Sequence, residues 1–146
     1  CNAKMNEFCA AMGLCNLRHV QDEIAKRKRI SKYYMERLAK IPGLQLASEQ
    51  KDVVSNYAYF PIVVHEDIFG KTRNQLCAAL KEQGVFARKY FYPLTNAIDC
   101  YAGRFSPEST PIALHISNRI LTLPLYADLD LQDADHICAV IEKLYQ

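Results

Sequence analysis

A threonine and a glutamine three residues apart mark the clearest local structure in this chain. Thr72 and Gln75 have the spacing of a capping box, in which two side chains satisfy free backbone amides at a helix start. This spacing predicts a helix over residues 73–83, ended by Gly84. The flanking runs, residues 57–64 and 85–92, are rich in aromatic and β-branched residues and predict two strands. A strand, helix, strand unit is therefore expected.

Pro61 lies inside the first of these runs, and proline cannot donate a backbone hydrogen bond to a neighbouring strand. We therefore expect this run to form an edge strand or to contain a bulge. A third, short strand is predicted over residues 120–123, where Pro124 ends the apolar run.

Apolar periodicity and capping residues predict the remaining helices. Asp22 is expected to cap a helix from Glu23 to Lys40, Thr110 and Pro111 to start a short one, and Asp130 to cap the last one. The first helix has apolar residues at a spacing that defines one buried face: Met5, Phe8, Cys9, Met12 and Cys15. The predicted fold class is α/β of the α+β type, with about three strands and helices packed on one side.

Composition excludes several classes of protein. The 146 residues suit one domain, and a net charge of +2 indicates no polyanion such as nucleic acid as a partner. No apolar run reaches the ~20 residues that span a bilayer, so we expect a soluble, cytoplasmic protein without a membrane partner. The four histidines lack the ligand spacing of a zinc site, and no metal is expected.

The start of the chain and its cysteines lead to two further predictions, one about the length of the whole protein and one about burial. The chain begins with Cys1 and an apolar helical segment, which indicates a C-terminal piece of a longer protein. Four cysteines fall within apolar helical patterns and are expected to be reduced and buried: Cys9, Cys15, Cys77 and Cys138.

Residues 88–92 are the best candidate for a ligand-binding surface. In an extended strand, alternation places Arg88, Tyr90 and Tyr92 on one side, with Lys89 and Phe91 on the other. Arginine pairs with phosphate and tyrosine stacks on flat groups, so this side suits a nucleotide sugar or another anionic ligand. An edge strand with charged side chains lying along the surface explains the pattern equally well.

Two other polar clusters have ordinary explanations. The basic run of residues 26–29 is typical of a solvated helix face, because it lacks interleaved aromatic residues. His65, Glu66 and Asp67 form the kind of polar loop that often precedes a helix, and no pattern brings them together as acid and base. The chain contains no complete catalytic set.

Four segments, in the same order, resemble the C-terminal third of the DegT/DnrJ/StrS family of nucleotide-sugar aminotransferases. They are NAKMNEFCAAMGLCNL, IAKRKRISKYYMERL, GVFARKYFYPL and ILTLPLYADLDLQDADHICAVIEKL. The segment ARKYFYPL is most similar to dTDP-4-keto-6-deoxyglucose 4-aminotransferases. The resemblance implies the small C-terminal domain of a fold type I enzyme over residues 41–146, with residues 1–40 linking it to a large domain and a dimer interface.

The resemblance also implies a chemistry. Family members use pyridoxal 5′-phosphate to move an amino group from glutamate to a keto sugar nucleotide, here in O-antigen or polysaccharide biosynthesis. The lysine that holds the cofactor would precede Cys1. No catalytic residue is therefore expected in this chain, which alone should hold no cofactor and be inactive.

The resemblance assigns roles to a few residues. Asn2 and Lys4 would bind the phosphate of the partner subunit's cofactor in a homodimer. Arg88, Tyr90 and Tyr92 would face the substrate, and residues 93–101 would line the sugar or nucleotide pocket. The apolar face of the first helix is expected to pair with another chain or to be poorly ordered.

A second interpretation stays open. The chain could be a non-catalytic α/β binding or dimerisation module whose cationic, aromatic strand recognises an anionic metabolite. A natural start close to Cys1 would favour the module, whereas about 200 preceding residues with alternating strands and helices would favour the enzyme.

Overall fold

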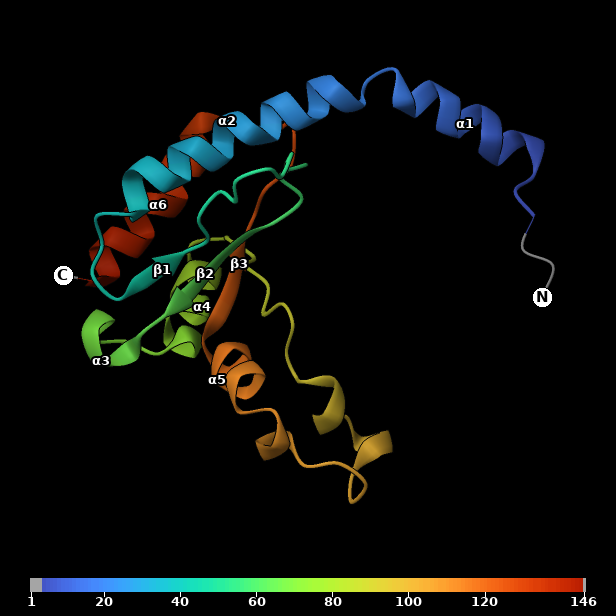
Figure 1. Ribbon diagram of the computed structural model, residues 1–146. Coiled ribbons are helices and arrows are strands. Elements are labelled where there is room, and N and C mark those ends of the chain that lie inside the picture. Colours follow the sequence, from blue (N-terminus) through green and yellow to red (C-terminus); the bar gives the residue numbers. More distant parts are fainter. Residues whose placement is uncertain (1–3, 146) are drawn as a thin grey trace.

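A three-stranded antiparallel sheet organises the computed structural model, which describes residues 4–145. The strands are β1 (Leu44–Leu46), β2 (Phe60–Val64) and β3 (Ile120–Leu123), with β2 in the middle. The helices are α1 (Glu7–Leu17), α2 (Val20–Leu38), α3 (Glu66–Phe69), α4 (Arg73–Glu82), α5 (Pro111–Arg119) and α6 (Leu131–Tyr145) (Figure 1). Within residues 4–145, no helix combines the length and the apolar character needed to cross a membrane.

Two of the predicted strands are present, since β2 lies within residues 57–64 and β3 is residues 120–123, but the third differs. Strand β1 was not predicted, and the prediction of a strand over residues 85–92 is wrong. In that segment only Arg88 pairs with the sheet, through backbone hydrogen bonds of 2.9 and 2.7 Å with Thr122 of β3. The chain then turns at Tyr90 and Phe91. The expected strand, helix, strand unit is therefore absent, and β3 is the next strand after α4.

Pro61 lies in the central strand, so the prediction of an edge strand or a bulge is also wrong. Pro61 pairs with Thr122 of β3. On the other side β1 ends at Leu46, which pairs with Ile62, so no β1 residue lies opposite Pro61. The proline is tolerated because the central strand has a neighbour on only one side at this position.

The core lies between the sheet and helices α2, α4 and α6. Alternate residues of β2 are buried, and α6 packs against both α2 and α4. Figure 1 shows α2 and α6 running side by side along one side of the sheet. The predicted cap of α6 is present, because Asp130 Oδ1 accepts a hydrogen bond of 2.9 Å from the Gln132 amide. The α/β fold class is thus confirmed, with β1 in place of the strand predicted over residues 85–92.

The predicted first residue is correct for helix α4 and wrong for helix α2. Helix α4 begins with the complete capping box of Thr72 and Gln75, as predicted. Helix α2 begins at Val20 instead of Glu23, so Asp22 lies in its first turn and does not cap it. The buried side chains of α2 belong to the same core as the sheet: Ile30, Tyr34 and Leu38.

Helix α1 extends away from the rest of the chain (Figure 1). None of its residues is buried, and the Phe8 side chain is 86% exposed. The predicted apolar face is therefore not covered by any described part of this chain. Cys9 and Cys15 are exposed for the same reason, so their predicted burial is wrong, whereas Cys138 is buried as predicted and Cys77 is half-buried.

Residues 93–110 form an excursion that leaves the sheet after Tyr92 and returns at α5 (Figure 1). The excursion contains short 3₁₀ turns and no long helix. Asn96 Nδ2 donates hydrogen bonds to Ser106 O at 3.2 Å and to Thr110 Oγ1 at 3.1 Å. These bonds join the outgoing and returning halves of the excursion.

Candidate functional site

Arg88 and Tyr90, two of the three residues predicted to face a ligand, contact each other. Arg88 Nη1 donates a hydrogen bond of 2.7 Å to Tyr90 Oη, and the guanidinium carbon lies 5.5 Å from the centre of the Tyr90 ring. Arg88 is exposed and forms no salt bridge with a carboxylate of residues 4–145. Its positive charge therefore remains available to an anion.

Both side chains line a groove of about 690 Å³. Its walls come from the residues before β2, the turn after α4, the end of β3 and the first half of α6. Besides Arg88 and Tyr90, the polar and aromatic lining consists of Tyr59, Gln83, Phe86, Thr122, Tyr126, Asp133 and His136. A groove of this size with a few polar groups around one cation has the usual character of a small-molecule site.

Two aromatic rings pack against Tyr90. The Phe91 ring stacks on it with centroids 5.0 Å apart and an interplanar angle of 13°. The Tyr59 ring meets it edge-on at 5.8 Å. Phe91 thus lies against Tyr90, contrary to the predicted alternation, because the chain turns here. Tyr59 and Tyr90 line the groove, and their rings form an aromatic wall that suits a flat base or a sugar ring, whereas Phe91 packs on Tyr90 without lining the groove.

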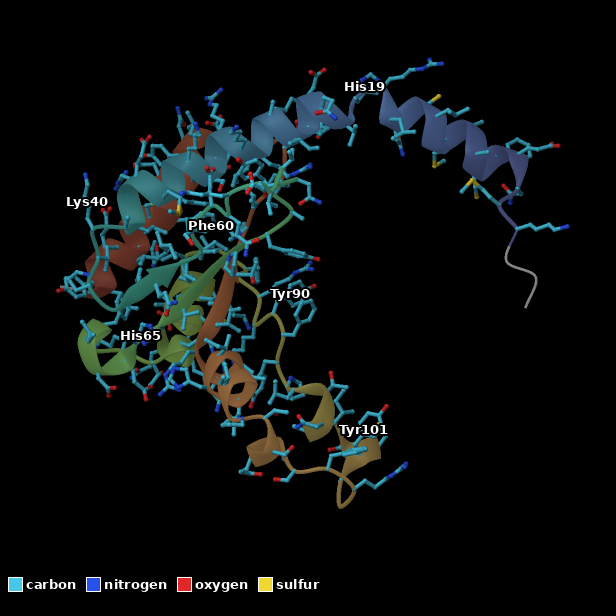
Figure 2. The ribbon with its side chains drawn as sticks, viewed as in Figure 1. His19, Lys40, Phe60, His65, Tyr90 and Tyr101 are labelled. Carbon is cyan, nitrogen blue, oxygen red and sulfur yellow. The ribbon has the colours of Figure 1, made fainter. Side chains whose placement is uncertain are left out.

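Tyr92, the third predicted residue, lies apart from the other two. It does not line the groove, and the guanidinium carbon of Arg73 lies 4.9 Å from the centre of its ring. The predicted common side required an extended strand, which the turn at Tyr90 and Phe91 interrupts. Figure 2 shows Tyr90 beside the sheet, while Tyr101 lies far out in the excursion.

The two residues assigned to the cofactor phosphate lie at the start of the chain. Asn2 is outside the described residues. Lys4 is exposed and precedes α1, and within the described residues it forms no salt bridge. Helix α1, which Lys4 precedes, extends away from the sheet (Figure 1). Lys4 therefore does not approach the Arg88 groove of its own chain.

The other polar clusters have structural partners. His65 Nε2 lies 2.9 Å from Gln45 Oε1, and Glu66 lies 3.9 Å from Arg119, which ties α3 to β1 and α5. In the basic run, Arg27 donates hydrogen bonds of 3.0 and 3.2 Å to Asn56 O. In the part of the chain that the structure describes, no three His, Cys, Asp or Glu side chains converge as metal ligands.

Tyr59, Tyr126 and His136 are groove residues that were not predicted. His136 Nε2 donates to Gln83 O at 3.4 Å, which joins α6 to the turn after α4. The position of Tyr59 could have been inferred from the sequence, because it directly precedes a strand whose alternate residues are buried. No sequence pattern indicates Tyr126 or His136, since these residues reach the groove only through the packing of β3 and α6.

The fold is that of aminotransferases. The structure superimposes on the aminotransferase TlmJ from Streptoalloteichus hindustanus with a TM-score of 0.84 and 20% identity, over 96% of this chain and 36% of that one. It superimposes on DesI, solved in the presence of its TDP-sugar product, with a TM-score of 0.89 and 29% identity, over 99% of this chain and 36% of that one.

The sequence comparisons define the family. The model of the DegT/DnrJ/EryC1/StrS aminotransferase family matches residues 1–142. The dTDP-4-amino-4,6-dideoxy-D-glucose transaminase of Escherichia coli is 39% identical over 145 residues, which cover 98% of this chain. The chain spans 38% of the length of that relative. The protein belongs to the DegT/DnrJ/EryC1/StrS aminotransferase family.

Proposed function

We propose that this chain is the C-terminal part of a transaminase that moves an amino group from glutamate to a keto sugar nucleotide, with dTDP-4-keto-6-deoxyglucose as the acceptor. Family membership and the name of the E. coli relative support this proposal. The family depends on pyridoxal 5′-phosphate, which carries the amino group between the two substrates when bound. Family membership favours this enzyme over a non-catalytic binding module.

The observation that carries the substrate assignment is the Arg88–Tyr90 pair in its groove. The Arg88 guanidinium, free of carboxylates within residues 4–145, would bind the diphosphate of the nucleotide sugar. Tyr90 and Tyr59 would flank its base or sugar through ring contacts. Tyr92 is 51% exposed, so its ring would be accessible to substrate next to residues 93–101, which would line the sugar or nucleotide pocket.

Asn2 and Lys4 are assigned to the cofactor phosphate of a neighbouring subunit. An amide and an ammonium group suit a phosphate, and the exposed Lys4 lies away from the groove of its own chain. A homodimer follows from this assignment, with the exposed apolar face of α1 covered in the assembly. The lysine that holds the cofactor belongs to the part of the protein that precedes this chain.

The test uses the full-length protein with added pyridoxal 5′-phosphate. We expect visible absorbance that borohydride abolishes, and amination of dTDP-4-keto-6-deoxyglucose with glutamate as donor. Arg88→Gln removes a charge-assisted hydrogen bond to phosphate, so the KM for the nucleotide sugar should rise by about tenfold to a hundredfold. The half-reaction with glutamate alone should be unchanged, because glutamate does not carry the diphosphate.

The matched control is Arg29→Gln, which removes an exposed arginine of α2 outside the groove. It should leave both half-reactions as in the parent protein. Absence of cofactor absorbance would exclude the transaminase. A normal sugar KM in Arg88→Gln would instead exclude this groove as the site that binds the diphosphate.

A further inference from the structure

We propose that Arg73 is a positioning residue that locks the base of the 93–110 excursion and thereby holds Tyr90 in the groove beside Arg88. The lock itself is independent of the reaction, whereas its effect on substrate binding rests on the proposed function. Arg73 was not singled out in the sequence, and it lies on α4, outside the groove.

Arg73 is only 4% exposed, which is unusual for an arginine. Its Nη1 donates hydrogen bonds of 3.1 Å to two backbone carbonyls, those of Ser117 and Ile120. Both carbonyls lie where α5 ends and β3 begins, after the excursion has returned to the sheet. The Arg73 side chain therefore binds the backbone just after residues 93–110 have returned to the sheet.

The same guanidinium also contacts the outgoing end. Its carbon lies 4.9 Å from the centre of the Tyr92 ring, and Tyr92 is the last residue before the excursion. A planar guanidinium can donate hydrogen bonds in its plane and stack on an aromatic ring with its face. Arg73 thus connects two segments that are distant in sequence, in a way that lysine or an apolar side chain cannot reproduce.

A buried charge needs compensation, and here no carboxylate among the described residues supplies it. Burial lowers the pKa of the Arg73 guanidinium. The carbonyls at the C-terminal end of α5 carry the negative end of the helix dipole, and the Tyr92 ring presents its electron-rich face. Within α4 itself, Asn74 Oδ1 also accepts a hydrogen bond of 3.0 Å from Arg73 Nε. The remaining partners of the charge belong to the two ends of the excursion and are lost if either end moves.

The consequence for the groove follows from the short connection between two anchors. Arg88 is fixed to Thr122 of β3 by two backbone hydrogen bonds, and Tyr92 is fixed by Arg73. Only Lys89, Tyr90 and Phe91 lie between these anchors. Release of Tyr92 would free the turn that stacks Phe91 on Tyr90 and that keeps the Tyr90 hydroxyl against Arg88.

The experiment measures hydrogen exchange by mass spectrometry in the full-length protein. Arg73→Met keeps an unbranched, flexible side chain and removes the guanidinium. Exchange in peptides covering residues 89–105, which contain the bonded amides of Tyr90, Ala97 and Tyr101, should become about tenfold faster. Exchange in β2 should be unchanged. Lys81→Met, an exposed position on the same helix, is the control and should change neither region.

Two Tyr92 variants separate the ring from the hydroxyl and remain informative if Arg73→Met fails to fold. Tyr92→Phe keeps the ring face and should retain slow exchange, whereas Tyr92→Leu should accelerate exchange over residues 89–105. Arg73→Lys should behave like Arg73→Met, because an ammonium cannot bond two carbonyls and stack at once. Unchanged exchange in both Arg73→Met and Tyr92→Leu would overturn the lock. If hydrogen exchange in β2 became faster by the same factor, Arg73 would stabilise the whole fold and not this segment in particular. That result would also overturn the lock.

Kinetics tests the second part of the proposal. Arg73→Met should raise the KM for the nucleotide sugar several-fold while the half-reaction with glutamate stays at the parent rate. Faster exchange with an unchanged sugar KM would refute positioning of Tyr90 and leave the lock standing. If the full-length protein does not aminate a nucleotide sugar at all, the proposed function fails, and the exchange data still decide the lock.

Discussion

Gly43 lies so close to Phe69 that a Cβ atom at position 43 would be 2.4 Å from the Phe69 backbone nitrogen. Gly43 also has a φ of +80°, and its carbonyl accepts a hydrogen bond of 2.8 Å from the His65 amide. This contact brings the loop before β1 against α3 and the end of β2. It explains why a glycine follows Pro42 in the chain.

Gly43→Ala should therefore be far more destabilising than Gly70→Ala. Gly70 has a nearly identical φ of +78°, but a Cβ atom there would have no neighbour within 4 Å. Both variants pay the strain of a left-handed backbone, about 1–2 kcal/mol. Gly43→Ala should lose about 1–3 kcal/mol more from the clash with Phe69. Urea unfolding of the two variants measures the difference, and equal losses would contradict the close approach.

Tyr34→Phe should destabilise the fold although it keeps the buried ring. Tyr34 is fully buried, its hydroxyl donates a hydrogen bond of 3.0 Å to Pro124 O, and burial raises the pKa of the phenol. Removal of the hydroxyl leaves the carbonyl without this donor, which costs about 1–3 kcal/mol. Thermal unfolding measures this loss. Tyr101→Phe in the excursion is the control, and a comparable loss there would refute the explanation.

Asp135 should make the stability depend on pH in the acid range. It accepts hydrogen bonds from the Tyr33 hydroxyl and from Arg37, which hold the pKa of its carboxyl below the usual range. A carboxyl whose pKa is lower in the folded state contributes stability above its unfolded pKa of about 3.9 and loses it as the pH falls through the folded value. Asp135→Asn should therefore flatten the decline of stability below about pH 5. Asp67→Asn should keep the parent slope in the same urea titrations, and parallel curves for all three proteins would contradict this role.

Cys138 should resist thiol reagents until the fold opens. It is buried against the core, and burial raises the pKa of its thiol to about 12, so little thiolate forms near pH 8. Cys100 lies exposed in the excursion. Labelling with iodoacetamide followed by peptide mass spectrometry should modify Cys100 first and Cys138 only after denaturant is added. Equal labelling of the two in native protein would show that the α6 core is open.

The candidate site was predictable in its chemistry and only partly in its geometry. An arginine and a tyrosine two residues apart indicated a cationic, aromatic surface, and the structure pairs Arg88 with Tyr90. The same pattern wrongly grouped Tyr92 with them, because alternation holds only in a continuous strand and the chain turns at Phe91. Arg73 gave no signal at all, since its partners are carbonyls of residues far along the chain.

Local signals in the sequence determined where several helices begin and end. The Thr72–Gln75 box and the Asp130 cap act within one turn of helix, so their neighbours in sequence are also their neighbours in space. The runs that form β2 and β3 were predicted from local composition, but the third strand and the pairing of all three were decided only by tertiary structure. The three residues of β1 form a strand because they meet β2, and the longer aromatic run after Gly84 does not, because only Arg88 reaches β3. Strand pairing depends on partners that are distant along the chain, and no local pattern contains that information.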